Sequence, residues 1–239
     1  MKAVLFDLDG TLLPMDQDKF IEAYMGTMAK KLACHGYDPE VLTKGVFTGI
    51  KSMILNDGSI TNEVAFWNAF VGIVGEHVKE DLPIFDDYYR NEFQSVAEVC
   101  GYDKRAKEII DFINEKGYKV VLATNPLFPS VATESRMRWA GLKKEDFAWY
   151  TTYENSSFCK PNPKYYMEIL EKIGLKPEEC LMVGNDVSED MVAETLGMKV
   201  FLLTDCIINK EKKDISAYPN GSFEELKEYL DTVLITEKM

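Results

Sequence analysis

Residues 3–11 read AVLFDLDGT, and this stretch gives the first indication of both the fold and the chemistry. The first four residues form a short apolar run, typical of a buried strand in a parallel sheet. Asp7 and Asp9 follow directly, one residue apart. Ligands of open α/β sheets bind at the carboxyl ends of the strands. We therefore expect two carboxylates at a ligand-binding edge. The alternative is a polar turn that only ends the strand, since Asp9-Gly10 is also a common turn sequence.

Four further apolar runs predict strands, with helical spacing between them. The alternation of strand and helix indicates a parallel sheet covered by helices, so we expect an α/β protein with a Rossmann-like core. A final amphipathic helix, from Phe223 to Val233, is expected to pack on this core. The later strands are predicted at residues 119–123, 149–152, 180–183 and 199–203.

The interval between the first two predicted strands is too long for a simple crossover and reads helical throughout. Phe20, Tyr24, Met28 and Leu32 recur every four residues on one helix face. Further helices are predicted at residues 39–56, 61–75 and 83–99, and a helix over 104–116 leads back to the sheet. We expect a helical cap at residues 15–95, inserted into a core made of residues 1–14 and 96–239.

Composition limits the class of protein and its partners. The 239 residues include 27 Lys and Arg against 40 Asp and Glu, a net charge of −13. This acidity opposes nucleic acid or an anionic membrane as the partner, since both attract clustered cations. The 5 cysteines contain no C-x-x-C pair, and the N-terminus has no signal-like apolar segment. We expect a cytoplasmic protein that is a monomer or a weak dimer.

Polar and charged residues also follow the later predicted strands. Thr124 and Asn125 come after the second strand, where a hydroxyl and backbone N–H groups could hold anionic oxygens. Lys160, between two prolines in its loop, follows the third strand, and Asp186 and Asp190 follow the fourth. Each is a weak signal alone, but together they surround one sheet edge. Carboxylates around Mg²⁺, with a lysine and a hydroxyl nearby, suit phosphoryl transfer.

The order and spacing of these residues resemble the haloacid dehalogenase superfamily of hydrolases. The resemblance rests on Asp7-Leu8-Asp9-Gly10-Thr11, then Thr124, then Lys160, and then Asp186 with Asp190. It covers the chain from Met1 to about Thr204. It implies a Rossmann-like core with a helical cap inserted after the first strand, which agrees with the insertion read from periodicity.

The resemblance also implies roles for the first two motifs. Asp7 would be the nucleophile that forms an aspartyl phosphate and would also bind Mg²⁺. Asp9 would serve as general acid and then general base, and its backbone carbonyl would bind Mg²⁺. Thr124, with Asn125 beside it, would bind the transferring phosphoryl group. An acid at position 9 favours phosphate ester hydrolysis over carbon–halogen cleavage, since dehalogenases of the superfamily lack it.

The last two motifs would complete the site. Lys160 would offset the negative charge on the phosphoryl group and hold Asp7. Asp186 would be an acidic Mg²⁺ ligand and Asp190 a supporting one. This chain departs from many members by placing Asn185 directly after Gly184, so Asn185 or Glu189 could share the metal binding.

The sequence thus predicts a Mg²⁺-dependent phosphatase that acts on a small phosphorylated metabolite. Two alternatives stay open: a phosphomutase of the same superfamily, and a catalytically silent binding or regulatory protein with this fold. Cap residues would choose the substrate, and the sequence alone does not show which of them reach the site.

Overall fold

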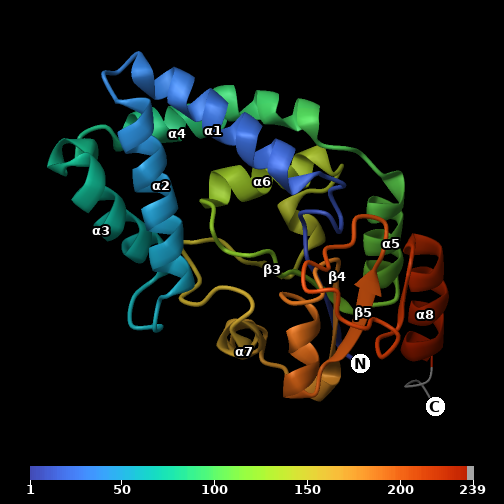
Figure 1. Ribbon diagram of the computed structural model, residues 1–239. Helices are drawn as coiled ribbons and strands as arrows, with labels where there is room; N and C mark the ends of the chain where they lie inside the picture. The colour runs from blue at the N-terminus through green and yellow to red at the C-terminus, as the bar shows by residue number, and fades with distance from the viewer. Residues whose placement is uncertain (236–239) are drawn as a thin grey trace.

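A parallel β-sheet forms the centre of the protein. The computed structural model describes residues 1–235, and within them a six-stranded sheet has the order β3-β2-β1-β4-β5-β6, with every neighbouring pair parallel (Figure 1). This confirms the predicted α/β class. The strands are β1 (Ala3–Phe6), β2 (Lys119–Leu122), β3 (Trp149–Tyr150), β4 (Cys180–Gly184), β5 (Lys199–Leu203) and β6 (Asn220–Gly221).

Side chains of the central strands alternate between two apolar layers, as the period of two requires. In β1, Val4 and Phe6 face one layer, whereas Ala3 and Leu5 face the other. Helices α5 (Lys104–Glu115) and α8 (Phe223–Ile235) cover the first face and lie side by side. Helix α7 (Pro163–Ile173) covers the second face. All four residues of β1 are therefore buried, which explains its uninterrupted apolar sequence.

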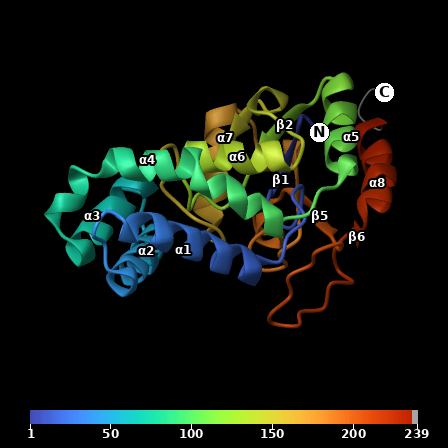
Figure 2. The same cartoon turned by 90° about the horizontal axis from the view of Figure 1, so that it is seen from above.

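The long interval between β1 and β2 is helical, as predicted. It contains α1 (Gln17–Ala33), α2 (Pro39–Ile54), α3 (Asn62–Val74) and α4 (Leu82–Arg90), which extend to one side of the sheet (Figure 2). We call α1 to α4 the helical insertion. Its two connections lie side by side, because Met15 and Cys100 form an antiparallel bridge and Gly101 N–H donates to the Pro14 carbonyl over 2.7 Å. The division into domains at residues 15 and 95 stays a prediction.

Two helix predictions were wrong in detail. Residues 83–99 do not form one helix: α4 ends at Arg90, and a 3₁₀ helix runs over Glu92–Val99. Asn91 separates the two, since its backbone, with φ of −116° and ψ of −83°, leaves the α-helical region. Its side-chain amide also donates to the Asp87 carbonyl. The segment after β4 is a 3₁₀ helix, Met191–Leu196, rather than an α-helix. The strand predicted at 149–152 is shorter, at Trp149–Tyr150.

Helix α6 (Ser130–Trp139) connects the insertion to the sheet. Ala132 of α6 is buried among the aromatic residues of α1 and α4, whereas Met137 packs in the layer beside α5. In the described residues, no helix is both long and apolar enough to cross a bilayer.

Packing between α5 and the sheet predicts a specific loss of stability. Ile110 is fully buried in the layer that joins α5 to β1 and β4. We expect Ile110→Ala to lower the free energy of unfolding by about 2–5 kcal/mol, because it leaves a cavity in this layer. Urea unfolding followed by circular dichroism measures this. Glu115→Ala, exposed on the same helix, should change the value by less than about 0.5 kcal/mol. Equal effects of the two variants would contradict the packing described.

Candidate active site

The loop after β1 begins the site. Asp7 continues β1, since its N–H donates to the Val183 carbonyl over 2.9 Å. Gly10 has a φ of +84°, and a Cβ there would lie 2.3 Å from Asn185 Nδ2. Glycine is therefore required at position 10 both for the turn and for the approach of the loop that follows β4. Thr11 Oγ1 lies 2.9 Å from Asn185 Oδ1 and 3.3 Å from Asp7 Oδ2, and can donate its proton to either.

Lys160 joins the first and last motifs. Its Nζ donates to Asp7 Oδ1 over 2.8 Å and to Asp190 Oδ1 over 2.6 Å. The lysine is 2% exposed and Asp190 is 1% exposed. Burial alone would lower the Lys160 pKa, but the charges of Asp190 and Asp7 raise it well above its ordinary value. Lys160 is therefore a buried cation shared by two carboxylates.

The loop after β4 positions Asp190 and Asp186. Gly184 ends β4, and a Cβ there would lie 2.1 Å from Asp190 Oδ2, so only glycine lets this carboxylate approach the backbone. Asp190 Oδ2 accepts the Asp186 N–H over 2.9 Å. Asp186 Oδ1 in turn accepts the N–H groups of Ser188 and Glu189. The two aspartates thus belong to one tight turn.

Asn125 links three loops of the site. Its Nδ2 donates to Glu189 Oε2 over 3.1 Å, and its Oδ1 accepts the Lys160 N–H over 3.3 Å. Tyr165 on α7 donates its hydroxyl proton to the Thr124 carbonyl over 2.8 Å. These contacts hold the loop after β2 against the loops that carry Lys160 and Glu189.

Arg136 on α6 is the partner of Asp9, and the sequence reasoning missed it. Its Nη1 forms an ion pair with Asp9 Oδ2, and its guanidinium lies over the Phe128 ring, 4.4 Å from the ring centre. Arg136 is fully buried, and arginine is rarely buried unless its charge is paired, as it is here by Asp9. No motif marks this residue, because the contact depends on how α6 is placed relative to the loop after β1.

The acids of the site outnumber its cations. Burial raises the pKa of Asp9 to about 6, with Arg136 opposing the shift and Asp7 adding to it. Burial likewise raises the pKa of Glu189 to about 7, against the opposing charge of Lys160. Burial also raises the pKa of Asp190, again opposed by Lys160. Burial is the largest cause of all three shifts, and the charges of Arg136 and Lys160 offset it only in part.

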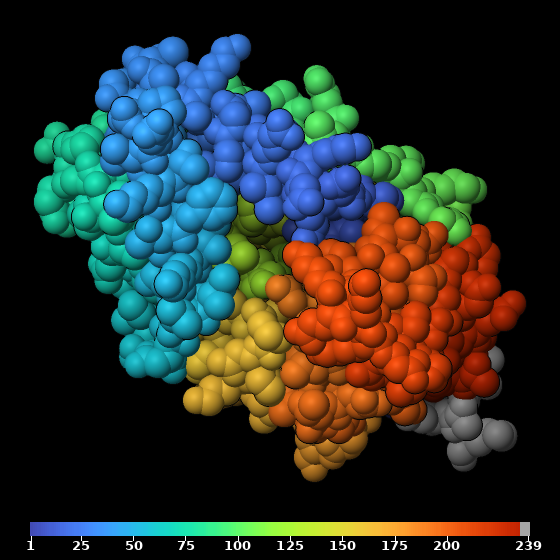
Figure 3. All heavy atoms as spheres, viewed as in Figure 1, coloured from blue at the N-terminus to red at the C-terminus, as the bar shows by residue number. Residues whose placement is uncertain are grey.

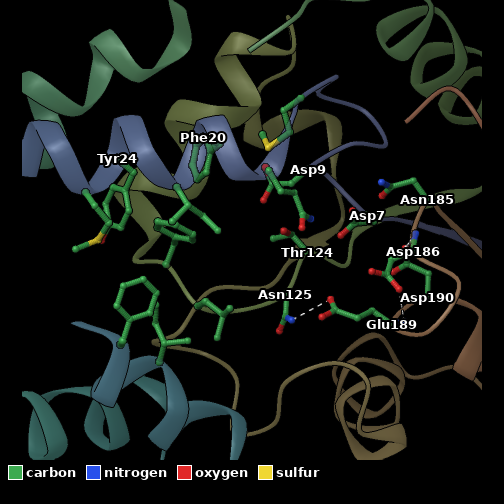
Figure 4. A pocket seen from close by; sticks show the side chains of 18 residues that line it. Asp7, Asp9, Phe20, Tyr24, Thr124, Asn125, Asn185, Asp186, Glu189 and Asp190 are labelled. Carbon is green, nitrogen blue, oxygen red and sulfur yellow. Dashed lines mark hydrogen bonds between the residues drawn. The ribbon is translucent and has the colours of Figure 1, made fainter. Parts of the chain in front are cut away.

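A cavity of about 260 Å³ opens between the helical insertion and the sheet edge. Figure 3 shows the molecule hollowed there, between the insertion and the loops after β4 and β5. Figure 4 shows acidic and amide side chains on one side of the cavity and the rings of Phe20 and Tyr24 on the other.

The structure brings all the predicted site residues together. Lys160 lies behind the cavity wall, in contact with Asp7 and Asp190. The other predicted site residues line the cavity: Asp7, Asp9, Thr124, Asn125, Asp186 and Asp190. Asn185 and Glu189, the two residues considered as extra metal ligands, line it as well. The roles assigned to these residues stay predictions. Cys159, beside Lys160, is buried, and burial raises the pKa of its thiol to about 12, which opposes a nucleophilic role.

The donor set fits a hard divalent cation. The side chains that line the polar end carry carboxylate and amide oxygens, the ligands that Mg²⁺ prefers. Within residues 1–235, no group of three or more His, Cys, Asp or Glu side chains is placed so that these side chains alone could hold a metal ion. Mg²⁺ does not need such a group, since it binds through one or two carboxylates and keeps several waters.

Comparison with known proteins identifies relatives and solved structures that this chain resembles along most of its length. A curated relative, the phosphoglycolate phosphatase of Vibrio parahaemolyticus, is 26% identical over 243 residues, covering 99% of this chain and 97% of its own. The 2-haloacid dehalogenase of Pseudomonas syringae pv. Tomato has a TM-score of 0.65 at 17% identity, covering 98% of this chain and 99% of its own.

A further solved structure contains magnesium and inorganic phosphate. A HAD family enzyme of Bacteroides thetaiotaomicron, in complex with magnesium and inorganic phosphate, has a TM-score of 0.52 at 19% identity, covering 91% of this chain and 98% of its own. At such identities the two solved structures show the fold alone. The family model described as haloacid dehalogenase-like hydrolase matches residues 1–193, most of the chain. The protein therefore belongs to the haloacid dehalogenase-like hydrolases.

Proposed function

We propose that the protein is a Mg²⁺-dependent phosphomonoester hydrolase that acts on a small phosphorylated metabolite through an aspartyl phosphate on Asp7. The observation that carries the proposal is the Asp7 carboxylate, held by buried Lys160 at the wall of a cavity that Asp9 also lines. The relative named phosphoglycolate phosphatase supports a small metabolite as substrate.

In the first step, a carboxylate oxygen of Asp7 attacks phosphorus and the ester P–O bond breaks. Asp9 donates a proton to the departing alcohol oxygen. Burial raises the pKa of Asp9 to about 6, closer to neutral pH than that of an ordinary aspartate, which favours a role as general acid. Its Oδ1 accepts no hydrogen bond from the described residues, whereas Oδ2 is paired with Arg136. Arg136 would thus orient Asp9 through one oxygen and leave the other for the proton.

In the second step, water attacks phosphorus, Asp9 accepts a proton from the water, and inorganic phosphate leaves as the Asp7 carboxylate is restored. Lys160 offsets the charge on Asp7 in both steps. Thr124 and Asn125 would bind the phosphoryl oxygens, since both line the same cavity as Asp7. Lys160, which contacts Asp7 and Asp190 from behind the cavity wall, would stabilise the phosphoryl group through its charge.

Asp7, the backbone carbonyl of Asp9, and Asp186 would hold Mg²⁺, with Asp190 in support. Bound there, Mg²⁺ would neutralise acidic charge and polarise a phosphate oxygen. Asp190 already uses its two oxygens for Lys160 and the Asp186 backbone, so its main contribution would be to fix these two partners. Asn185 and Glu189 are the candidates for additional ligands, as both line the cavity. The proposal includes a cytoplasmic monomer or weak dimer that binds neither nucleic acid nor membranes.

Phosphate release tests the proposal. We expect the purified protein with Mg²⁺ to release inorganic phosphate from at least one member of a panel of phosphomonoesters that includes phosphoglycolate. EDTA should abolish the release, and excess Mg²⁺ should restore it. Asp7→Asn should lower kcat by about 10³-fold or more, because the nucleophile is lost. Asp18→Asn, an exposed aspartate in α1, should stay within about twofold of the wild type.

Other outcomes would identify the alternatives. Full activity of Asp7→Asn would exclude the proposed nucleophile. Conversion of a sugar phosphate to its isomer without phosphate release would indicate a phosphomutase. A protein that remains folded, binds Mg²⁺ and releases no phosphate from any ester of the panel would support the silent binding role.

The proposed role of Asp9 predicts a separate pattern. Asp9→Asn should slow both phosphorylation of Asp7 and hydrolysis of the intermediate by about 100-fold or more, since both need its proton transfer. Its Mg²⁺ affinity, measured by calorimetry, should change only a few-fold, because the backbone carbonyl is retained. Rapid-quench kinetics separate the two steps. Loss of Mg²⁺ binding with an unchanged first step would contradict the assignment.

A further inference from the structure

The cavity has a second half that the proposed chemistry does not use. Opposite the carboxylates, helices α1 and α2 supply a wall made of Gln17, Phe20, Ile21, Tyr24, Met25, Phe47 and Ile50. These side chains are apolar apart from the Gln17 amide and the Tyr24 hydroxyl. Figure 4 shows the Phe20 and Tyr24 rings facing the same space as Asp7 and Asp9. A substrate with its phosphate at the acidic end would place its leaving group against this wall.

As far as the structure describes its lining, the cavity supplies amide and hydroxyl groups but no cation that could pair with a second negative charge. Within the described residues, none of the side chains that line it is Lys, Arg or His. The two nearby cations, Lys160 and Arg136, are buried and already contact carboxylates. A carboxylate or second phosphate on the leaving group would lie unpaired between an apolar wall and five acids. Burying an unpaired charge is costly, so this arrangement selects against anionic leaving groups.

Some side chains of this wall are exposed to solvent, and Tyr24 is fixed by its neighbours. Ile21 is 44% exposed and Phe47 is 49% exposed, so a hydrocarbon group bound in the cavity would cover apolar surface that now faces solvent. The Tyr24 ring packs against Phe128 with ring centres 5.2 Å apart, and its hydroxyl is hydrogen-bonded to that of Tyr89 over 2.9 Å. Tyr24 therefore presents its ring rather than a free hydroxyl to the cavity.

We infer that the substrate is the phosphomonoester of an uncharged, mainly hydrocarbon alcohol, with its apolar group bound by α1 and α2. This inference rests on the proposed function for the position of the phosphate. It goes further by naming the chemistry of the leaving group, which the catalytic residues do not determine.

Non-hydrolysable phosphonates test the inference without turnover. We expect calorimetry with saturating Mg²⁺ to show that butylphosphonate binds at least tenfold more tightly than 3-phosphonopropionate, a ligand of similar length that ends in a carboxylate. Butylphosphonate should also bind roughly 15-fold more tightly than ethylphosphonate, because each of its two additional buried methylenes contributes about fourfold in affinity. Equal or tighter binding of 3-phosphonopropionate would overturn the inference.

A matched pair of variants locates the effect. Ile21 lines the cavity and is 44% exposed, whereas Ile54, at the end of α2, is 46% exposed and does not line it. Ile21→Lys should weaken butylphosphonate binding at least tenfold and strengthen 3-phosphonopropionate binding. Ile54→Lys should leave both affinities within about twofold. The same response from both variants would overturn the assignment of this wall.

Rates of phosphate release from the panel of esters distinguish the hydrolase proposal from the inference about the leaving group. Faster phosphate release from anionic esters than from butyl or phenyl phosphate would overturn the inference and leave the hydrolase proposal standing. Preferential binding of butylphosphonate without hydrolysis of any ester would overturn the hydrolase proposal and leave the binding preference standing.

Discussion

The site depends on one buried interaction, the contact of the Lys160 ammonium with both Asp7 and Asp190. Three charged groups of such low exposure are stable only when they are paired, since an isolated buried charge is very costly. The loops after β1, β3 and β4 must therefore meet at one point. Two glycines make this approach possible: Gly10 allows the contact with Asn185, and Gly184 allows the Asp190 carboxylate to lie against the backbone.

The same constraint links the fold to the chemistry. Parallel strands place their carboxyl ends at one edge, which concentrates acids from separate parts of the chain in a small volume. Burial then raises the pKa of Asp9 and Glu189, because Arg136 and Lys160 offset only part of the cost of burying these carboxylates. A divalent cation bound at this edge would supply the opposite charge for the carboxylates and for a phosphate. Among the described residues, the helical insertion contributes no cation to the cavity and forms its apolar half. The charged side chains of the cavity all come from the loops at the sheet edge.

Much of this arrangement could be predicted from sequence, because buried strands and their loops are local signals. The apolar runs of β1 and β5 have the predicted bounds, and the predicted site residues after the strands meet as expected. Arg136 could not be predicted, since its pairing with Asp9 depends on tertiary placement. The break at Asn91 lies in the backbone conformation of that one residue, and helical spacing does not reveal it. The apolar wall combines residues of α1 and α2, and no sequence motif predicts how these two helices are placed relative to each other.

The central claim is that the Asp7 carboxylate becomes phosphorylated. Borohydride reduces an acyl phosphate to an alcohol, which would convert a phosphorylated Asp7 to homoserine. The protein should be quenched with borohydride during turnover with Mg²⁺ and a hydrolysed ester, and its peptides then sequenced by mass spectrometry. The account predicts homoserine at position 7, dependent on both substrate and Mg²⁺. Turnover with no modification at Asp7, or with modification at another residue, would contradict it.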